Sequence, residues 1–181
     1  MELLRTARVL LRRWQEDDLP AYLDIYSRDE VMRWLGRHPR RTLTDLHEAG
    51  ERLRRWHERE ANLAVPYGFW ALVPCTETDE REPPVGTVLL VPLVDAAGST
   101  GEVEIGWHLH PNWQGRGLVT EAAAAVLGRA KAVGRKRVLA LTDLDNSASQ
   151  SVAMRLGMVD EGVTDRWFGL TRRQFVWSPM S

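Results

Sequence analysis

The stretch EVEIGWHLHPNWQGRGLVTEA, residues 102–122, constrains the fold more than any other part of the chain. Its opening segment, EVEIGWHLH, alternates residue by residue, which is typical of a strand with two different faces. The run that follows is rich in alanine and predicts a helix over 118–133, with Gly134 as its C-terminal cap. Because glycine is unfavourable inside a helix, Gly115 and Gly117 are expected in the turn that joins the strand to the helix.

The periodicity of the remaining chain predicts a mixed α/β (α+β) domain whose first half is largely antiparallel. Apolar residues recur every three or four positions in QEDDLPAYLDIYSRDEVMRWL and again over about 42–60, and this spacing indicates helices. A later helix begins at Asn146 or Ser147 and ends at Gly157. Apolar, β-prone runs predict strands at 8–14, 67–73, 85–94, 102–110 and 136–144, with one or two more in 166–178.

Composition and charge limit the kind of protein that this chain can be. Its 181 residues fit a single domain, 1–181, with a sizeable hydrophobic core. The formal net charge of −1 gives no overall attraction to nucleic acid or to an anionic membrane, so neither partner is expected. The single cysteine, Cys75, excludes an internal disulfide, and no stretch is apolar for long enough to form a signal peptide or a membrane span. We therefore expect a cytoplasmic protein.

The glycine turn has two interpretations on its residues alone. The first turn of a helix offers unpaired N–H groups and the positive end of the helix dipole, and glycine lets a ligand approach the backbone, so the turn could hold a phosphate. It could equally be an ordinary turn between a strand and a helix. The two common nucleotide-binding patterns are absent from the sequence, because no G-x-x-x-x-G-K-[ST] occurs and Thr120 stands where G-x-G-x-x-G needs its third glycine.

Three blocks of the sequence resemble the GNAT superfamily of N-acetyltransferases, and together they cover nearly the whole chain. EIGWHLHPNWQGRGLVTEA is similar to the acyl-CoA-binding core of that superfamily, Q/R-x-x-G-x-G/A, except that Val119 stands where the family usually has glycine or alanine. LLRRW…EDDLPAYLDIYSRDEVMRWLG and DNSASQSVAMRLGMVDEG resemble the branch that contains the ribosomal-protein-alanine N-acetyltransferases, which are RimJ/RimL-like.

The resemblance implies a single GNAT domain that uses acetyl-CoA as its co-substrate. Its mixed, mostly antiparallel sheet would have about six or seven strands and about four flanking helices, with a central parallel pair that splays apart. The pantetheine arm would fill that gap, and the pyrophosphate would lie on the amides of the glycine turn. The Arg116 side chain would add charge at the rim or remain in solvent. The residues implied to bind the cofactor are Leu109, Gln114, Gly115, Arg116, Gly117, Val119, Thr120 and Asn146.

The resemblance also implies candidate catalytic residues for direct transfer of the acetyl group to a primary amine. That reaction requires a deprotonated amine, a polarised carbonyl and a stabilised thiolate. Glu104 is expected to be the general base, with a pKa raised by burial, although it could instead be structural, and Glu102 is the alternative base. Many family members use a tyrosine as the acid, but Ala153 stands at that position. Ser149 is the implied donor to the thiolate, unless its hydroxyl bonds the helix backbone.

The acceptor pocket is expected to include His108 and Trp34. His108 and His110 share a strand face with Glu104 if alternation holds, so the three could hold a metal, but lining the pocket is the favoured role and no metal is expected. A bulge at 107–109 would reverse which side chains face the substrate. Trp34 and Trp56 belong to the early helical region that covers the acceptor site in this family. Either could line the pocket, although packing of an amphipathic helix is the alternative role that the pattern favours.

The identity of the amine acceptor remains open at this level. The branch implies a protein N-terminus, whereas an amino acid or an aminoglycoside would suit the family equally well. The missing tyrosine also leaves open a CoA-binding domain with little turnover. Dimers are common in the family, so a homodimer is one expectation, but no residue of the sequence fixes its interface.

Overall fold

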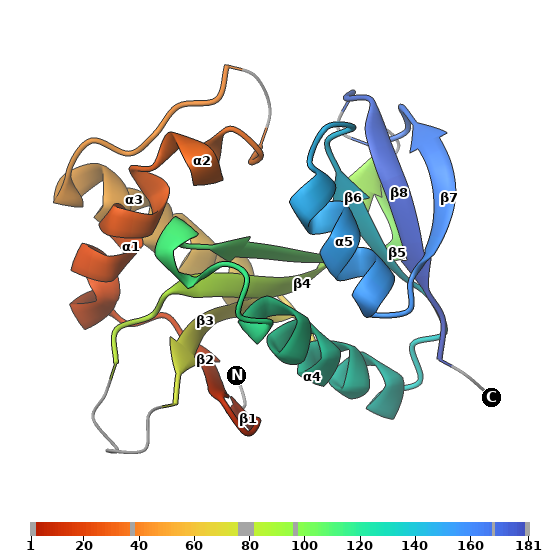
Figure 1. The fold of residues 1–181 in the computed structure, drawn as a ribbon, viewed down its shortest axis with the longest axis horizontal. Helices are drawn as coiled ribbons and strands as arrows, with labels where there is room; N and C mark the ends of the chain where they lie inside the picture. The colour runs from red at the N-terminus through yellow and green to blue at the C-terminus, as the bar shows by residue number, and fades with distance from the viewer. Residues whose placement is uncertain (1–2, 37–38, 76–81, 96–97, 168, 180–181) are drawn as a thin grey trace.

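One mixed sheet organises the molecule. The computed structural model describes residues 3–36, 39–75, 82–95, 98–167 and 169–179. The strands are β1 (Leu4–Arg5), β2 (Val9–Arg13), β3 (Gly68–Pro74), β4 (Gly86–Asp95), β5 (Gly98–Leu109), β6 (Val138–Thr142), β7 (Val159–Thr164) and β8 (Arg172–Trp177). They form one eight-stranded sheet in the order β1-β2-β3-β4-β5-β6-β8-β7 (Figure 1). The pair β5 and β6 is parallel, and the other neighbouring pairs are antiparallel.

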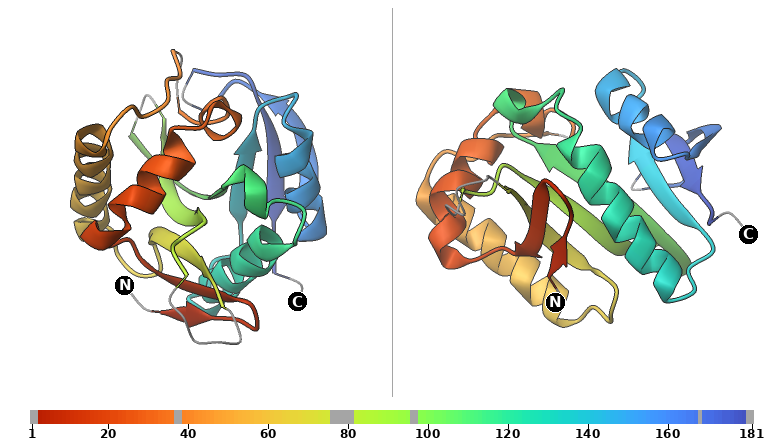
Figure 2. Two further views of the ribbon diagram at one scale, coloured as in Figure 1. Left: turned by 60° about the vertical axis from the view of Figure 1, so that its left-hand side comes forward. Right: turned by 60° about the horizontal axis from the view of Figure 1, so that its bottom comes forward.

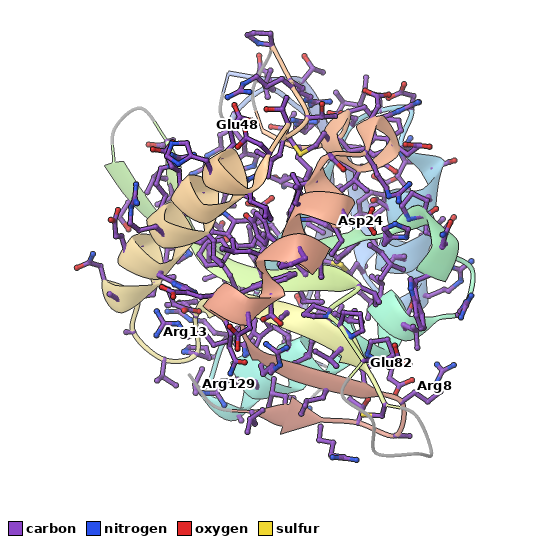
Figure 3. The ribbon with its side chains drawn as sticks, turned by 90° about the vertical axis from the view of Figure 1, so that its left-hand side faces the viewer. Arg8, Arg13, Asp24, Glu48, Glu82 and Arg129 are labelled. Atoms are coloured by element: carbon purple, nitrogen blue, oxygen red, sulfur yellow. The ribbon has the colours of Figure 1, made fainter. Side chains whose placement is uncertain are left out.

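The helices lie on both faces of this sheet. They are α1 (Leu19–Tyr26), α2 (Asp29–Met32), α3 (Leu46–Ala61), α4 (Leu118–Ala132) and α5 (Ser147–Arg155), with 3-10 turns at Glu16–Asp18 and Pro111–Trp113. The α4 helix crosses one face of the sheet, and α1 and α3 cover the other (Figure 2). Figure 3 views the molecule from the α1 and α3 side, with Asp24 on α1 and Glu48 on α3.

The sequence of β3, GFWALVP, is apolar at every position. The strand is buried along its whole length because both faces of the sheet are covered there. Trp70 and Leu72 belong to the core cluster beneath α4, whereas the intervening Ala71 belongs to a second cluster with residues of α1 and α3, among them Tyr22 and Leu53. Because successive side chains of a strand point to opposite faces of the sheet, β3 contributes to two separate cores.

The predicted architecture is confirmed, and the structure corrects the number of strands and the boundaries of some elements. The sheet has eight strands where about six or seven were expected. The unpredicted β7 strand, with sequence VDEGVT, lies at the sheet edge and has mostly exposed side chains, so it carries no apolar pattern. The β5 strand begins at Gly98, four residues before its expected start at residue 102. The stretch QEDDLPAYLDIYSRDEVMRWL forms two helices, α1 and α2, where one was expected. The chain breaks between them because Arg28 is extended.

The parallel pair at the centre of the sheet separates after a single point of contact. Glu104 of β5 pairs with Leu139 of β6, and this is the one registered pair between the two strands in the described part of the chain. The other edge of β5 stays paired with β4 as far as Leu109, opposite Gly86. Beyond Glu104, the edge of β5 that faces β6 therefore has no strand beside it. This divergence is the expected splay of the central pair.

The described helices also bear on membrane insertion. Among the residues that the structure describes, no helix combines the length and the apolar character that a membrane crossing requires.

Candidate active site

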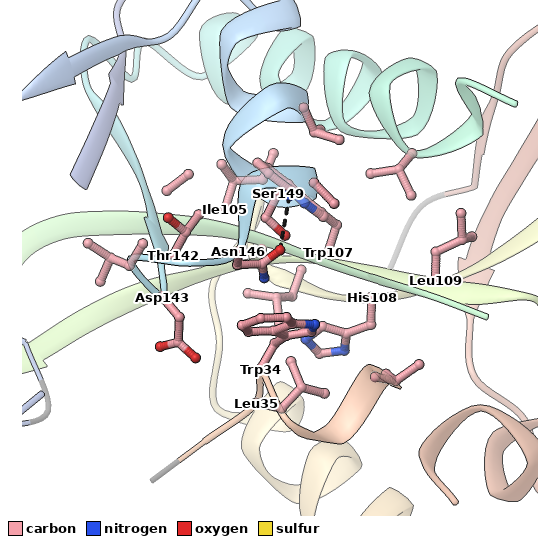
Figure 4. Close-up of a pocket in the computed structure, with 18 of the residues that line it drawn as sticks. Trp34, Leu35, Ile105, Trp107, His108, Leu109, Thr142, Asp143, Asn146 and Ser149 are labelled. Carbon is pink, nitrogen blue, oxygen red and sulfur yellow. Dashed lines mark hydrogen bonds between the residues drawn. The ribbon is translucent and has the colours of Figure 1, made fainter. Parts of the chain in front are cut away.

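A pocket of about 1030 Å³ opens where β5 and β6 diverge (Figure 4). Its walls come from three sources. The second half of β5 and the end of β6 line the floor, the first turns of α4 and α5 line one side, and residues of α2, α3 and the segment that follows α2 line the other. The divergence of two parallel strands thus creates a cavity that is bordered by two helix N-termini on one side and by the N-terminal helices on the other.

The glycine turn lies in the wall of this pocket. Gly115 and Gly117 both adopt the left-handed conformation, with φ of +76°, which few other residue types accept. A Cβ added at Gly115 would meet no atom within 4 Å, so the backbone there faces open space. Gly117 is the N-cap of α4 and brings no side chain to cap the helix. The first amides of α4 are therefore accessible to an anion in the pocket.

An ion pair at the sheet edge holds this turn in place. Arg8 precedes β2, and its Nη1 donates to the carbonyl oxygen of Arg116 at 3.0 Å, while its Nε donates to Oε2 of Glu121 at 2.7 Å. Glu121 Oε1 also accepts from the hydroxyl of Thr6 at 2.5 Å and from the backbone amide of Arg8 at 2.9 Å. These bonds fix the start of α4 relative to β2 without using the pocket face of the turn.

All but one of the residues expected to bind the cofactor line the pocket. The exception is Arg116, whose guanidinium lies 4.6 Å from the ring centroid of Trp113, where its Nη2 donates to the carbonyl of Asn112 at 3.0 Å. The side chain thus folds back over Trp113 and does not line the pocket. The seven that line it are Leu109, Gln114, Gly115, Gly117, Val119, Thr120 and Asn146.

Of the two glutamates considered as the base, Glu104 faces the pocket. It lies at the point where β5 and β6 separate and is partly exposed there. Burial raises the pKa of Glu104 to about 7, and the charges of Arg59 and Arg172 oppose this rise. Glu102 instead pairs with Arg137 at 3.5 Å and does not line the pocket. A carboxyl with this pKa can exchange a proton near neutral pH.

His108 lines the pocket and is held from behind by Tyr26. A hydrogen bond of 2.9 Å joins the Tyr26 hydroxyl to His108 Nδ1, and another of 2.8 Å joins it to Thr87 Oγ1. Burial, aided by the positive charge of Arg52, lowers the pKa of His108 to about 3, so its ring is neutral near pH 7. The pairing of β4 with β5 is regular from Gly86↔Leu109 to Pro92↔Val103, so alternation holds over 107–109.

His110 does not join Glu104 and His108. Its Nδ1 accepts from the Asn112 amide at 3.1 Å, and its Nε2 lies 3.2 Å from Oδ2 of Asp24 on α1. Within the described ranges, no group of three or more histidine, cysteine, aspartate or glutamate side chains is placed to hold a metal ion. The arrangement of these three residues is therefore not that of a metal centre.

Asn146 and Ser149 lie at the N-terminus of α5, on the pocket wall. Asn146 caps the helix, and its Oδ1 accepts from the Ser149 amide at 3.1 Å (Figure 4). The Ser149 hydroxyl makes no hydrogen bond to any residue that the structure describes, so it is available to the pocket. Ala153, one turn further on, is buried in the core and does not line the pocket.

Comparison with known proteins agrees with this geometry. Residues 8–159 match the model of the acetyltransferase (GNAT) domain. The chain belongs to this family. The matched region of this GNAT acetyltransferase runs from β2 to the start of β7 and includes both diverging strands and the glycine turn. The family membership that the three sequence blocks predicted is therefore confirmed.

Solved structures share the fold of this GNAT acetyltransferase at low sequence identity. A GNAT-family acetyltransferase from Bacillus anthracis is 17% identical with a TM-score of 0.75, and the match covers 99% of this chain and 98% of that one. RimL, a ribosomal L7/L12 alpha-N-protein acetyltransferase solved with coenzyme A, is 16% identical with a TM-score of 0.74 and coverage of 98% of each chain. The microcin C7 self-immunity acetyltransferase MccE, solved with acetyl-CoA and AMP, is 16% identical with a TM-score of 0.73, covering 96% of this chain and 94% of that one.

The structure also brings residues to the pocket that the sequence did not single out. Asp143, at the end of β6, accepts from Nη2 of Arg40 at 3.1 Å and forms an ion pair with Arg172 of β8. The side chains of Arg40 and Arg172 are each only 8% exposed. This cluster joins the segment after α2 to the C-terminal half of the GNAT domain. No local pattern could reveal it, because its members are far apart in the sequence.

The helix wall of the pocket was only partly anticipated. Trp34 was expected there and lines it, as does His108 (Figure 4). Arg52, Trp56 and Arg59 of α3 line it as well. Their spacing places them on one face of a helix, and this was the signal in the sequence, but the amphipathic pattern of α3 favoured packing as the role of Trp56.

Proposed function

We propose that this acetyltransferase moves the acetyl group of acetyl-CoA directly to a primary amine. The observation that carries the proposal is the position of Glu104. Its carboxyl faces the pocket at the point where β5 and β6 part, and burial raises its pKa to about 7. A base with such a pKa, in a pocket that an unpaired strand edge and a glycine turn also line, suits proton removal from an amine near neutral pH.

The residues around the pocket fit acetyl-CoA. The edge of β5 beyond Glu104 has no neighbouring strand, so its backbone groups are available to the amides of a pantetheine arm. The open backbone at Gly115 and the uncapped first turn after Gly117 suit a pyrophosphate. Asn146 borders the same space from α5. When bound, acetyl-CoA supplies a thioester whose carbonyl carbon is open to attack by a nucleophile.

The side chains then divide the proton transfers between them. Glu104 accepts a proton from the ammonium form of the acceptor, which frees the nitrogen lone pair for bond formation to the carbonyl carbon. As the carbon–sulfur bond breaks, Ser149, whose hydroxyl has no partner among the described residues, donates its proton to the departing sulfur. The nitrogen loses its second proton, which reaches the Ser149 oxygen through solvent and restores the hydroxyl, and Glu104 later releases its own proton to solvent. Because both substrates share one pocket, their proximity contributes much of the acceleration.

The acceptor is a primary amine, and a protein N-terminal amine is the first candidate. The resemblance to the RimJ/RimL-like branch favours it, and RimL is named as an alpha-N-protein acetyltransferase. A small-molecule amine such as an amino acid or an aminoglycoside is the second candidate. Trp56 and Phe69, whose rings stack at 4.9 Å in the pocket wall, offer a small flat apolar surface that suits a compact acceptor.

Thiol release from acetyl-CoA tests the proposal. The purified protein is mixed with acetyl-CoA and with a panel of free amines and N-terminal peptides. We expect steady thiol release that depends on the added amine and an acetylated product in mass spectrometry. Binding of CoA without turnover on any amine or peptide would favour instead a CoA-binding domain with little activity.

A further inference from the structure

The arginines of α3 fall into two groups. Arg54 and Arg55 point away from the pocket, and each lies 3.8 Å from a carboxylate oxygen of Glu51. Arg52 and Arg59 line the pocket, and neither has a carboxylate within ion-pair distance among the described residues. An amphipathic helix normally keeps its charges on the solvent side. Arg52 is half-buried, whereas Arg59 is exposed and also acts on Glu104 at longer range. Because neither guanidinium has an ion-pair partner within the described chain, both are available to an anion in the pocket.

Arg52 is held against aromatic rings with its hydrogen-bonding capacity almost unused. Its guanidinium carbon lies 4.6 Å from the ring centroid of Tyr26 and 5.8 Å from that of Trp56. The hydrogen bond that it makes within the described chain goes from Nη1 to the sulfur of Met32 at 3.2 Å, and a thioether is a weak acceptor. Stacking occupies the face of a guanidinium and leaves its in-plane N–H donors for a partner.

Arg59 repeats this arrangement two helical turns away. Its guanidinium carbon lies 5.4 Å from the ring centroid of Phe69. Between the two arginines, Trp56 stacks on Phe69 with the ring planes 20° apart. The wall of the pocket thus presents a flat apolar surface flanked by two positive charges. An anionic group with an apolar body would satisfy both features.

We propose that Arg52 and Arg59 form an anion-binding subsite that selects an acceptor whose primary amine carries a nearby carboxylate. The proposal rests on the proposed function, because it places the acceptor between α3 and Glu104. The carboxylate binds the in-plane donors of Arg52, the apolar part lies against Trp56 and Phe69, and the amine is left toward Glu104. Arg59 adds positive charge at the far end of this surface. Two sources have this chemistry: the α-carboxylate of a free amino acid, and the side-chain carboxylate of an acidic residue next to a peptide N-terminus.

Calorimetry in the presence of CoA tests the subsite by binding alone. The ligands are a panel of free amino acids, each paired with its amide, and amidated dipeptides with aspartate or asparagine as the second residue. We expect the best carboxylate ligand to bind about ten- to hundredfold more tightly than its neutral partner, as loss of charge-assisted hydrogen bonds predicts. The pair that shows the larger preference identifies the source.

Variants of α3 test whether Arg52 carries the preference. Arg52→Gln removes the charge and should abolish most of the preference, whereas Arg52→Lys should keep part of it. Arg54→Gln is the matched control, because Arg54 lies on the same helix with its side chain 64% exposed and outside the pocket, and the preference should persist. Melting curves check that each variant is folded.

Equal affinity for carboxylates and amides across the panel would overturn the inference, as would an unchanged preference in folded Arg52→Gln. Turnover is measured separately by thiol release. Tight carboxylate binding without turnover would support the subsite and contradict the proposed acetyl transfer, so the two failures can be told apart.

Discussion

The two sides of the pocket differ in which part of the chain they expose, since one presents mainly backbone groups and the other mainly side chains. The side that borders the glycine turn consists mainly of backbone: the unpaired edge of β5, the left-handed Gly115 and Gly117, and the first turn of α4. The opposite side consists of side chains, with Arg52 and Trp56 of α3 prominent among them. Backbone groups suit a ligand that never changes, and side chains suit one that differs between family members. Under the proposed function, the backbone side would serve as a general donor site and the side-chain side as a specific acceptor site.

Replacing the residue between these two sides should have the largest effect. Glu104→Gln removes the proposed base while keeping the shape of the side chain, and kcat/KM should fall about 10²- to 10⁴-fold. The wild-type kcat/KM should rise with pH through about 7, because the carboxyl must be ionised to accept a proton. The variant should lack that rise, and its affinity for CoA should stay close to wild type. Initial rates from pH 5 to 9 measure both, and an identical pH profile in the variant would refute the base assignment.

Disturbing the backbone side should weaken CoA binding and leave acceptor selectivity alone. Gly117→Val places a β-branched residue at φ +76°, which is strained, and puts a side chain at the first turn of α4. We expect the Kd for CoA to rise about ten- to hundredfold in calorimetry. Gly115→Ala is the milder companion, since a Cβ there meets no atom within 4 Å. Normal CoA affinity in a folded Gly117→Val variant would mean that the turn does not hold the pyrophosphate.

Disturbing the side-chain wall should impair the use of the acceptor and leave CoA binding unchanged. Tyr26→Phe removes the hydroxyl that holds His108 Nδ1 at 2.9 Å and Thr87 Oγ1 at 2.8 Å. One neutral hydrogen bond contributes roughly 1 kcal/mol, so kcat/KM for the acceptor should fall about fivefold. The Kd for CoA should not change. Steady-state kinetics with varied acceptor and calorimetry with CoA separate the two quantities, and a weaker CoA complex would show that the two sides are not independent.

The contrast also explains what could be predicted from the sequence. The backbone side depends on short-range patterns, because the alternation over 102–110, Gly115 and Gly117, and the alanine-rich helix follow one another in the chain. Each pattern has a local physical cause, so together they predicted the strand, the turn and the helix. The splayed parallel pair was predicted from the family resemblance and not from periodicity.

The side-chain wall could not be predicted from the sequence, because its members come together only in the folded chain. Asp143 meets Arg40 and Arg172 although these residues belong to three distant segments. The apolar and charged spacing of α3 predicted a helix, but which of its arginines face the pocket depends on how the helix packs against β3. The β7 strand was missed for a related reason, because an exposed edge strand needs no apolar residues.

The smallest expected effect concerns Arg116, the one charged side chain of the glycine turn. Family resemblance left open whether it adds charge at the rim of the pyrophosphate site or remains in solvent. In the structure its guanidinium packs 4.6 Å from the Trp113 ring centroid and donates to the Asn112 carbonyl. If the backbone alone holds the anion, Arg116→Ala should change the Kd for CoA by less than about threefold, which is the range of ordinary surface substitutions. Calorimetry at low and moderate salt decides the matter, because a side chain that neutralises a phosphate makes binding more salt-dependent. A large loss that shrinks at high salt would assign Arg116 to the ligand, and the donor side would then no longer be built from backbone alone.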